Sequence, residues 1–217
     1  MDRIHAGSFQ YGKQTQTAAT LIEQVIAGRS GAIARVTSCV YDMLTAANTV
    51  SHVLAFMKAL AHGTLQTTPA VSATSIVVDT ASLAAAYMGG DILATSDRIV
   101  YQYTDGTWEA NTVTAINTTT GALTVTALSA TRVLVAGQRI YYMGIPGDGA
   151  HLLLNCKGTV VTNLNDPIAG VAQGGFQRVV SEVNYKRTGY GDPMLFSSNN
   201  ATTAGMLASL SGYYAKQ

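Results

Sequence analysis

Apolar and polar residues alternate along both ends of the chain. The segment from Ala32 to Leu44 follows a period of two, and Arg178 to Lys186 repeats that pattern. Successive side chains of a β-strand point to opposite faces, so this period predicts strands with one face toward a core. Further strands are expected over Thr17–Ala27, where a helix also fits the pattern, and over Gly205–Tyr214, where a short helix is the alternative.

The segment Thr49–Leu60 is β-branched at its start and predicts another strand, although Ala, Leu and Met also allow a helix in its second half. A turn-like sequence, Thr45 to Asn48, separates it from the strand before it. Two strand candidates around a short turn favour a β-hairpin.

The middle of the chain has shorter predicted strands and more closely spaced turn residues than the two ends. After a Pro- and Thr-containing linker, Gly63 to Ala73, the region Thr74–Met143 holds about six short strands with turn residues at close intervals, such as Asp105-Gly106 and Asn117–Gly121. Short strands at this spacing are typical of a small antiparallel barrel.

Together these patterns predict an all-β protein. We expect an extended N-terminal arm over residues 1–16, and a jelly-roll-like β-sandwich domain built from 17–66 plus 150–217. A small antiparallel β-barrel domain over 70–148 is expected to be inserted between the two parts of the sandwich.

The charge content and net charge of the chain exclude several classes of protein. Charged residues make up 12% of the 217 residues, hydrophobic residues 47%, and the formal net charge is +1. Few charges with many apolar residues exclude a disordered chain, and a near-zero net charge gives no field for nucleic acid or an anionic membrane. A surface poor in charge suits a chain that is packed in an assembly.

The chemistry-bearing residues form no recognisable motif. The four histidines show no metal-ligand spacing, the two cysteines match no zinc pattern, and no nucleophile elbow or phosphate loop occurs. A pairing of Cys156 with His151 as nucleophile and base would need two residues of one strand that point to opposite faces. We therefore predict no catalytic, cofactor-binding or metal site, no cofactor, and thiols that act as small buried hydrophobes. The residues concerned are His5, His52, His62, His151, Cys39 and Cys156.

Three carboxylates, Asp91, Asp97 and Asp105, lie at predicted strand ends and could gather at one rim of the barrel. Turn formation by Asp is the preferred interpretation. The N-terminus has no apolar signal-peptide core and no apolar run reaches the length of a membrane span, which predicts that the protein is made and used without secretion through the usual route.

The sequence of the middle region resembles a small barrel cassette of tailed-bacteriophage virion proteins, and its flanks are similar in style to capsid decoration (cement) proteins. The cassette-like segments are Thr74–Asp79, Gly90–Ile92, Gly106–Ile116, Gly121–Thr126 and Ala136–Tyr141, and the flanks are Ser38–Asp42, Ala46–Met57 and Pro193–Tyr214.

This resemblance implies a non-enzymatic virion protein on the capsid surface that clamps neighbouring major capsid proteins. Its expected partners are the major capsid protein and itself, as a dimer or trimer, without nucleic acid or membrane. One alternative is a tail- or fibre-associated barrel that binds a host glycan or receptor through an exposed aromatic and carboxylate cluster at one rim, near Trp108, Tyr101 and Asp105. The other is an enzyme acting on cell-wall polysaccharide, which would need a carboxylate pair in a cleft.

Overall fold

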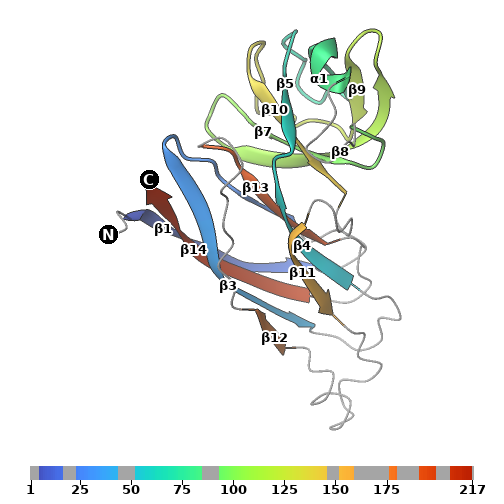
Figure 1. Cartoon of the computed structure of the whole chain (residues 1–217). Coiled ribbons are helices and arrows are strands. Elements are labelled where there is room, and N and C mark those ends of the chain that lie inside the picture. Colours follow the sequence, from blue (N-terminus) through green and yellow to red (C-terminus); the bar gives the residue numbers. More distant parts are fainter. Residues whose placement is uncertain are drawn as a thin grey trace.

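The structure is a computed structural model of the chain, and its strands form three antiparallel sheets (Figure 1). It describes residues 5–16, 23–43, 52–84, 93–145, 152–158, 176–179, 191–198 and 206–216. Within these ranges the single helix, α1, is the five-residue Thr80–Ala84, and no helix is long and apolar enough to cross a membrane. The all-β class predicted from the sequence is confirmed.

Two four-stranded sheets form the body. The first has the order β1 (His5–Gln16), β14 (Met206–Lys216), β3 (Ala32–Met43) and β12 (Phe176–Val179). The second has the order β11 (Leu152–Gly158), β4 (His52–Lys58), β13 (Met194–Ser198) and β2 (Glu23–Ile26).

The order of the body strands is that of a jelly roll. Along the chain, β1, β2, β3 and β4 alternate between the two sheets, and so do β11, β12, β13 and β14. The last strand enters the first sheet between β1 and β3, and the last but one enters the second sheet between β2 and β4. Eight strands in two sheets with this order make the β-sandwich that the sequence predicted.

The third sheet lies between β4 and β11 in the sequence and curls on itself. Its order is β5 (Ala61–Thr64), β10 (Arg139–Gly144), β7 (Arg98–Gln102), β8 (Trp108–Asn117), β9 (Ala122–Val125) and β6 (Ser75–Val77). A bridge between Leu65 and Val78 joins the ends of the two outermost strands. The curled sheet is therefore the small antiparallel barrel expected from the sequence.

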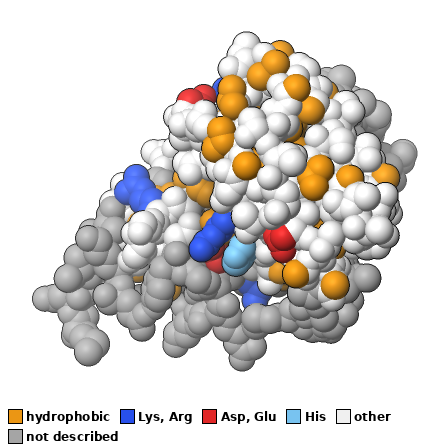
Figure 2. Space-filling model, turned by 90° about the horizontal axis from the view of Figure 1, so that it is seen from above, with side chains coloured by type: hydrophobic (Ala, Val, Ile, Leu, Met, Phe, Trp, Pro, Cys, Tyr) orange, Lys and Arg blue, Asp and Glu red, His pale blue; other side chains and the backbone are white. Residues whose placement is uncertain are grey.

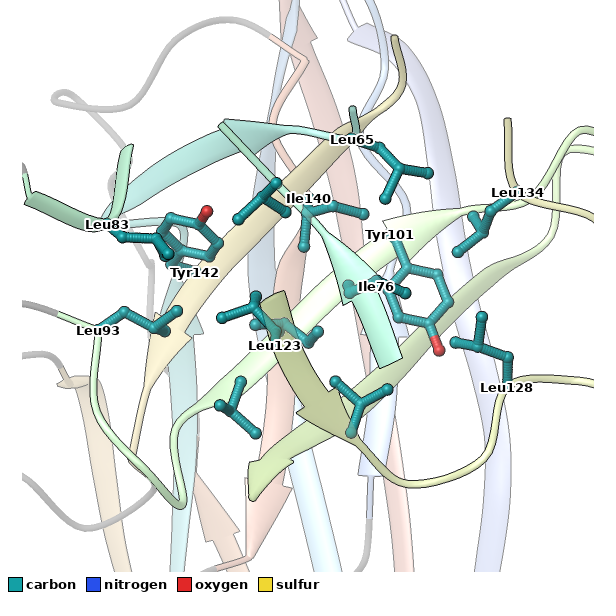
Figure 3. Close-up of a cluster of buried hydrophobic side chains, with 14 of the residues drawn as sticks. Leu65, Ile76, Leu83, Leu93, Tyr101, Leu123, Leu128, Leu134, Ile140 and Tyr142 are labelled. Carbon is teal, nitrogen blue, oxygen red and sulfur yellow. The ribbon is translucent and has the colours of Figure 1, made fainter. Parts of the chain in front are cut away.

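Apolar side chains fill this barrel (Figure 3). They come from every strand and from α1 and include Leu65, Ile76, Leu83, Leu93, Ile99, Tyr101, Leu123, Leu128, Leu134, Ile140 and Tyr142. The buried tyrosines keep hydrogen-bond partners at their hydroxyls, as buried polar groups require. Tyr142 Oη lies 2.8 Å from Ser82 Oγ, and Tyr101 Oη donates to Glu109 Oε1 at 3.2 Å.

Three local predictions are wrong. The hairpin around Thr45–Asn48 does not form, because β3 and β4 belong to different sheets. The expected linker Gly63–Ala73 begins inside β5, and the expected connector Leu83–Gly90 begins inside α1. For the hairpin and the linker, pairing with distant strands decided the outcome, and a local turn signal does not contain that information.

The segment predicted as an arm is extended, as β1, and pairs antiparallel with β14 of the same chain. The predicted domain limits, 1–16, 17–66 plus 150–217 and 70–148, stay predictions.

Two glycines offer a matched test of the barrel turns. Gly121 (φ 75°) and Gly137 (φ 88°) both have left-handed backbone, but a Cβ at Gly121 would lie 2.0 Å from Val78 O, whereas a Cβ at Gly137 would meet nothing within 4 Å. We expect Gly137→Ala to lower the free energy of unfolding by about 1 kcal/mol and Gly121→Ala by about 3 kcal/mol or more, because only the latter displaces a packed strand. Urea unfolding measures both values, and equal losses would contradict this packing.

The buried phenols predict an alkaline loss of stability. Burial raises the pKa of Tyr142 from 10.0 to about 12, and burial also holds the pKa of Tyr101 well above its usual range. Between pH 10 and 12 the unfolded chain loses the Tyr142 proton while the folded chain keeps it, so the free energy of unfolding falls as the pH rises. Tyr142→Phe should fall less steeply over this window in urea unfolding at several pH values. Parallel curves for the two proteins would rule out the predicted contribution.

Candidate functional site

The joint between the barrel and the jelly-roll body is the best-defined site in the described residues. Arg98, at the start of β7, forms an ion pair with Glu23 of β2. Ser197 of β13 donates a hydrogen bond from Oγ to Glu23 Oε1 at 3.0 Å. Three strands from two sheets therefore meet at one carboxylate.

This ion pair is shielded from water on the arginine side. The side chain of Arg98 is 6% exposed and that of Glu23 is 22% exposed. The Nε atom of Arg98 is buried and has no hydrogen-bond partner within the described residues. A buried guanidinium with one principal partner depends strongly on that partner, because its desolvation is not otherwise compensated.

A cluster of apolar side chains also joins the two sheets at this joint. The buried set is Met57, Ala59, Val100, Tyr141, Met143 and Leu195, with Val25, Trp108 and Ala110 partly buried against it. These residues come from β4, β7, β10 and β13, with β2 and β8 at the side, and β2 lies against β8. The joint therefore combines hydrophobic burial with a directional ion pair, which fixes the orientation of the barrel on the body.

Aromatic rings extend the joint toward the surface. The ring of Tyr141 lies 5.9 Å from that of Trp108 and 6.2 Å from that of His62, measured between centroids, at interplanar angles of 44° and 49°. Burial raises the pKa of the Tyr141 hydroxyl. Tilted aromatic contacts of this kind add packing energy beyond the buried area, and they suit a static joint.

The rim cluster of carboxylates, the less favoured of the two interpretations, does not form between Asp97 and Asp105. Asp97 precedes β7 and Asp105 follows it, so the two lie at opposite ends of that strand, and Asp91 lies outside the described residues. Asp97 Oδ2 accepts a hydrogen bond from the Ala94 amide at 2.9 Å, and Asp105 Oδ1 accepts one from the Thr107 amide at 2.8 Å, which lowers the pKa of Asp105. The preferred interpretation, turn formation, is confirmed for these two residues.

The cluster proposed for glycan binding does not form a common exposed surface. Tyr101 is fully buried in the barrel core, and Trp108 is partly buried against the joint. Only Asp105 is exposed. Alternation along β7 and β8 could not show which face of the strands is interior, and the sequence prediction placed Tyr101 on the wrong side.

The histidines and cysteines are only partly described. His62 lies exposed in β5 beside Tyr141. His5, His52, Cys39 and Cys156 lie in β1, β4, β3 and β11, and their side chains lie outside what the structure describes, as does His151 altogether. The described residues hold no group of three or more His, Cys, Asp or Glu that could bind a metal ion.

Sequence reasoning missed the Arg98–Glu23 pair. The sequence did hold a hint of this pair, because Glu23 and Arg98 are charged residues that each lie next to apolar residues of a predicted strand. Charges next to a buried run often have a partner, but the spacing along the chain does not reveal which one.

The comparisons with known proteins add little to this geometry. No family model and no curated protein matches the chain. Among solved structures, the chain is similar to VP17, a capsid protein of bacteriophage P23-77, with 16% identity and a TM-score of 0.22 over 96% of this chain and 99% of that one. It is similar, at the same identity and TM-score, to the VP16–VP17 complex of the two major capsid proteins of that bacteriophage, over 94% of this chain and 100% of that one. A TM-score of 0.22 is too low for a shared arrangement to be inferred.

The joint predicts a non-additive mutant cycle. Glu23→Gln leaves Arg98 buried without its counter-charge and should lower the free energy of unfolding by about 3 kcal/mol. Adding Arg98→Met to this variant removes the unpaired buried charge and should recover at least half of the lost free energy of unfolding. Arg132→Met serves as control, because the ion pairs of Arg132 in the described part of the chain, at 3.6 Å to Asp105 and 3.7 Å to Glu109, are more accessible to water. Urea unfolding measures all variants, and additive losses for the joint would show that the pair is not coupled.

Proposed function

We propose that the chain is a structural protein of a virus capsid. The observation that carries this proposal is the strand order of the body, β1-β14-β3-β12 and β11-β4-β13-β2, with a barrel inserted between β4 and β11. Jelly rolls of eight strands are the recurrent building unit of viral capsids, although lectins and cupins share them, so this step is an analogy at the level of the fold.

Features of the chain itself support an assembled state. Only 12% of the residues are charged, where a free soluble domain carries about twice that share. In the described part of the chain, β1 is a twelve-residue edge strand that pairs with β14 alone, and it contains a single lysine and no carboxylate. A long edge with few charges is a liability in a free protein and a ready contact for a neighbouring chain.

The joint supports the same role. Arg98, Glu23 and the apolar side chains around them hold the barrel in one orientation on the body. A fixed barrel gives every copy the same outline, which a regular lattice requires. Static, rigid contacts repeated over many copies add up to a large stabilisation of the assembly.

Two capsid roles follow from different observations. The jelly-roll body favours a subunit that builds the shell. The resemblance of the flanking segments to decoration proteins favours a protein that binds the outside of a finished shell and clamps neighbouring major capsid proteins. We favour the shell subunit, because the strand order involves both halves of the chain, whereas the resemblance rests on short segments.

A reconstruction of virus particles that contain this chain tests the proposal. We expect the chain at regular positions throughout the lattice, with the eight-stranded body in contact with its neighbours. Particles produced without the chain distinguish the two roles: a missing shell supports the subunit, and an intact but less rupture-resistant shell supports the decoration protein. Finding the chain at the tail only, or absent from particles, would refute both.

A further inference from the structure

A layer of polar side chains crosses the joint next to its apolar cluster. Residues two apart on a β-strand point to the same face. On four strands of the joint, a residue of the apolar cluster therefore shares its face with a polar residue two positions away. The apolar residues are Val25, Val100, Ala110 and Leu195, and the polar residues are Glu23 of β2, Arg98 of β7, Thr112 of β8 and Ser197 of β13. We call these four polar residues the polar layer.

Strand register brings the polar layer together. Arg98 lies opposite Thr112 in the β7–β8 ladder, and Ser197 lies opposite Glu23 in the β13–β2 ladder. The Cβ atoms of residues that lie opposite each other in this way are about 5 Å apart. The Arg98–Glu23 ion pair and the hydrogen bond from Ser197 Oγ to Glu23 join the two ladders. One small region of the joint therefore holds a guanidinium, a carboxylate and two hydroxyls.

One donor of this guanidinium has no acceptor. The Nη2 atom of Arg98 contacts Glu23 Oε2, whereas Nε is buried and forms no hydrogen bond with any described residue. Only 6% of the Arg98 side chain is exposed, so bulk water does not reach Nε. Buried N–H groups in proteins have a partner with few exceptions, because an unpaired donor loses its bonds to water without compensation. The Nε atom therefore indicates a further acceptor.

A second carboxylate does not supply that acceptor. Asp97, the residue before Arg98, accepts a backbone amide at 2.9 Å, and Glu109 of β8 accepts a tyrosine hydroxyl at 3.2 Å. No Asp, Glu, Lys or Arg occurs in 110–131 or 140–147, which contain most of β8 and β10, the strands on either side of β7. Figure 2, which looks down on the barrel, likewise shows a mostly uncharged surface with charged side chains toward its borders.

The backbone opposite Arg98 is irregular. Gly144 of β10 lies opposite Arg98, whereas the next residue of β7 pairs with Tyr142. Met143 is therefore an extra residue in β10, and Gly144 has a left-handed backbone with φ of 80°. A β-bulge of this kind interrupts the ladder and leaves its extra residue unpaired. The main chain beside Arg98 thus departs from a regular ladder at the place where a small polar molecule would bind.

The charge balance decides what the acceptor is. Glu23 already neutralises Arg98, so an added anion would leave a net negative charge in a place shielded from water. A neutral acceptor avoids that charge. Water fits this requirement, since internal waters bind buried polar groups that lack a partner and form about three hydrogen bonds each. The carboxylate of Glu23 and the hydroxyl of Thr112 are acceptors for the two hydrogens of such a molecule.

We propose that one internal water molecule is bound at the joint. It accepts the hydrogen of Arg98 Nε and donates its own two hydrogens to Glu23 and Thr112 of the polar layer. The water then links β7 with β8 and β2, and it belongs to the contact that holds the barrel on the body. The inference goes beyond the capsid role and does not require it.

Nuclear magnetic resonance of the full chain tests this proposal at the Nε–H group itself. We expect the Hε proton of Arg98 to exchange slowly with solvent and to show a dipolar cross-peak to a long-lived bound water. The Hε proton of Arg132 is the control in the same spectrum. The Arg132 side chain is 41% exposed, so its Hε proton should exchange at least tenfold faster.

Two threonine variants of β8 form a matched pair. Thr112→Val removes a hydroxyl of the polar layer at nearly constant volume and should reduce the water cross-peak of Arg98 at least twofold. Thr114→Val makes the same change at an exposed position of the same strand and should leave that cross-peak unchanged. Equal thermal unfolding midpoints make the two variants comparable, and equal cross-peaks would contradict the bond to Thr112.

Three results would overturn the bound water. Fast exchange of the Arg98 Hε proton would show that Nε is open to solvent. Slow exchange without a water cross-peak would show that a protein group, such as Glu23 itself, is the acceptor. An anomalous peak beside Nε in crystals soaked in bromide would show an anion in place of water. None of these results bears on the capsid role, which the particle reconstruction tests separately.

Discussion

The position of the last strand is the constraint on which the whole body depends. β14 lies between β1 and β3, with Leu210 opposite both Tyr11 and Cys39. The first sheet therefore cannot be completed until the two ends of the chain have met. In the second sheet β13 lies in the same way between β2 and β4. Strand pairings of such large sequence separation require the closure of a long loop. The chain loses conformational entropy in that step before the new contacts stabilise it.

The inserted barrel eases that constraint. Two of its pairings, β7 with β8 and β8 with β9, join near neighbours in the sequence, whereas β10 pairs with β5 and β7, and β6 pairs with β9, over longer separations. All of these pairings lie within 61–144, so none of them depends on a strand of the body. Once formed, it holds the end of β4 close to the start of β11, and these two strands pair in the second sheet. The Arg98–Glu23 pair then ties the barrel to β2, so that the joint connects a unit whose strands pair among themselves with the long-range topology of the body.

How much of this could be predicted from the sequence follows from the range of each interaction. The barrel strands carried their own signals: β-branched runs, and turns with an Asp or Asn that accepts hydrogen bonds from backbone amides two residues on, as Asp105 and Asn117 do. Period-two alternation likewise located β3, whereas β14 was expected as a strand with a short helix as the alternative. The sequence did not show which strands are neighbours, because the residue pattern of one strand does not identify the strand with which it pairs. The hairpin around Thr45–Asn48 failed for that reason.

The same limit applies to the candidate site. The absence of a catalytic motif was visible in the sequence, whereas the ion pair between Glu23 and Arg98 was not, because it joins strands of two different sheets. Tyr101 shows the opposite error, because an aromatic residue offered as a surface contact is fully buried.

The central claim is the jelly-roll order of the body, and cross-strand nuclear Overhauser effects between backbone protons test it most directly. The fold predicts contacts from β14 to both flanking strands, such as Leu210 with Tyr11 and with Cys39, and from Leu195 of β13 to Val25 and Met57. Contacts between β3 and β4 as a hairpin, with none from β14 to β1, would contradict it.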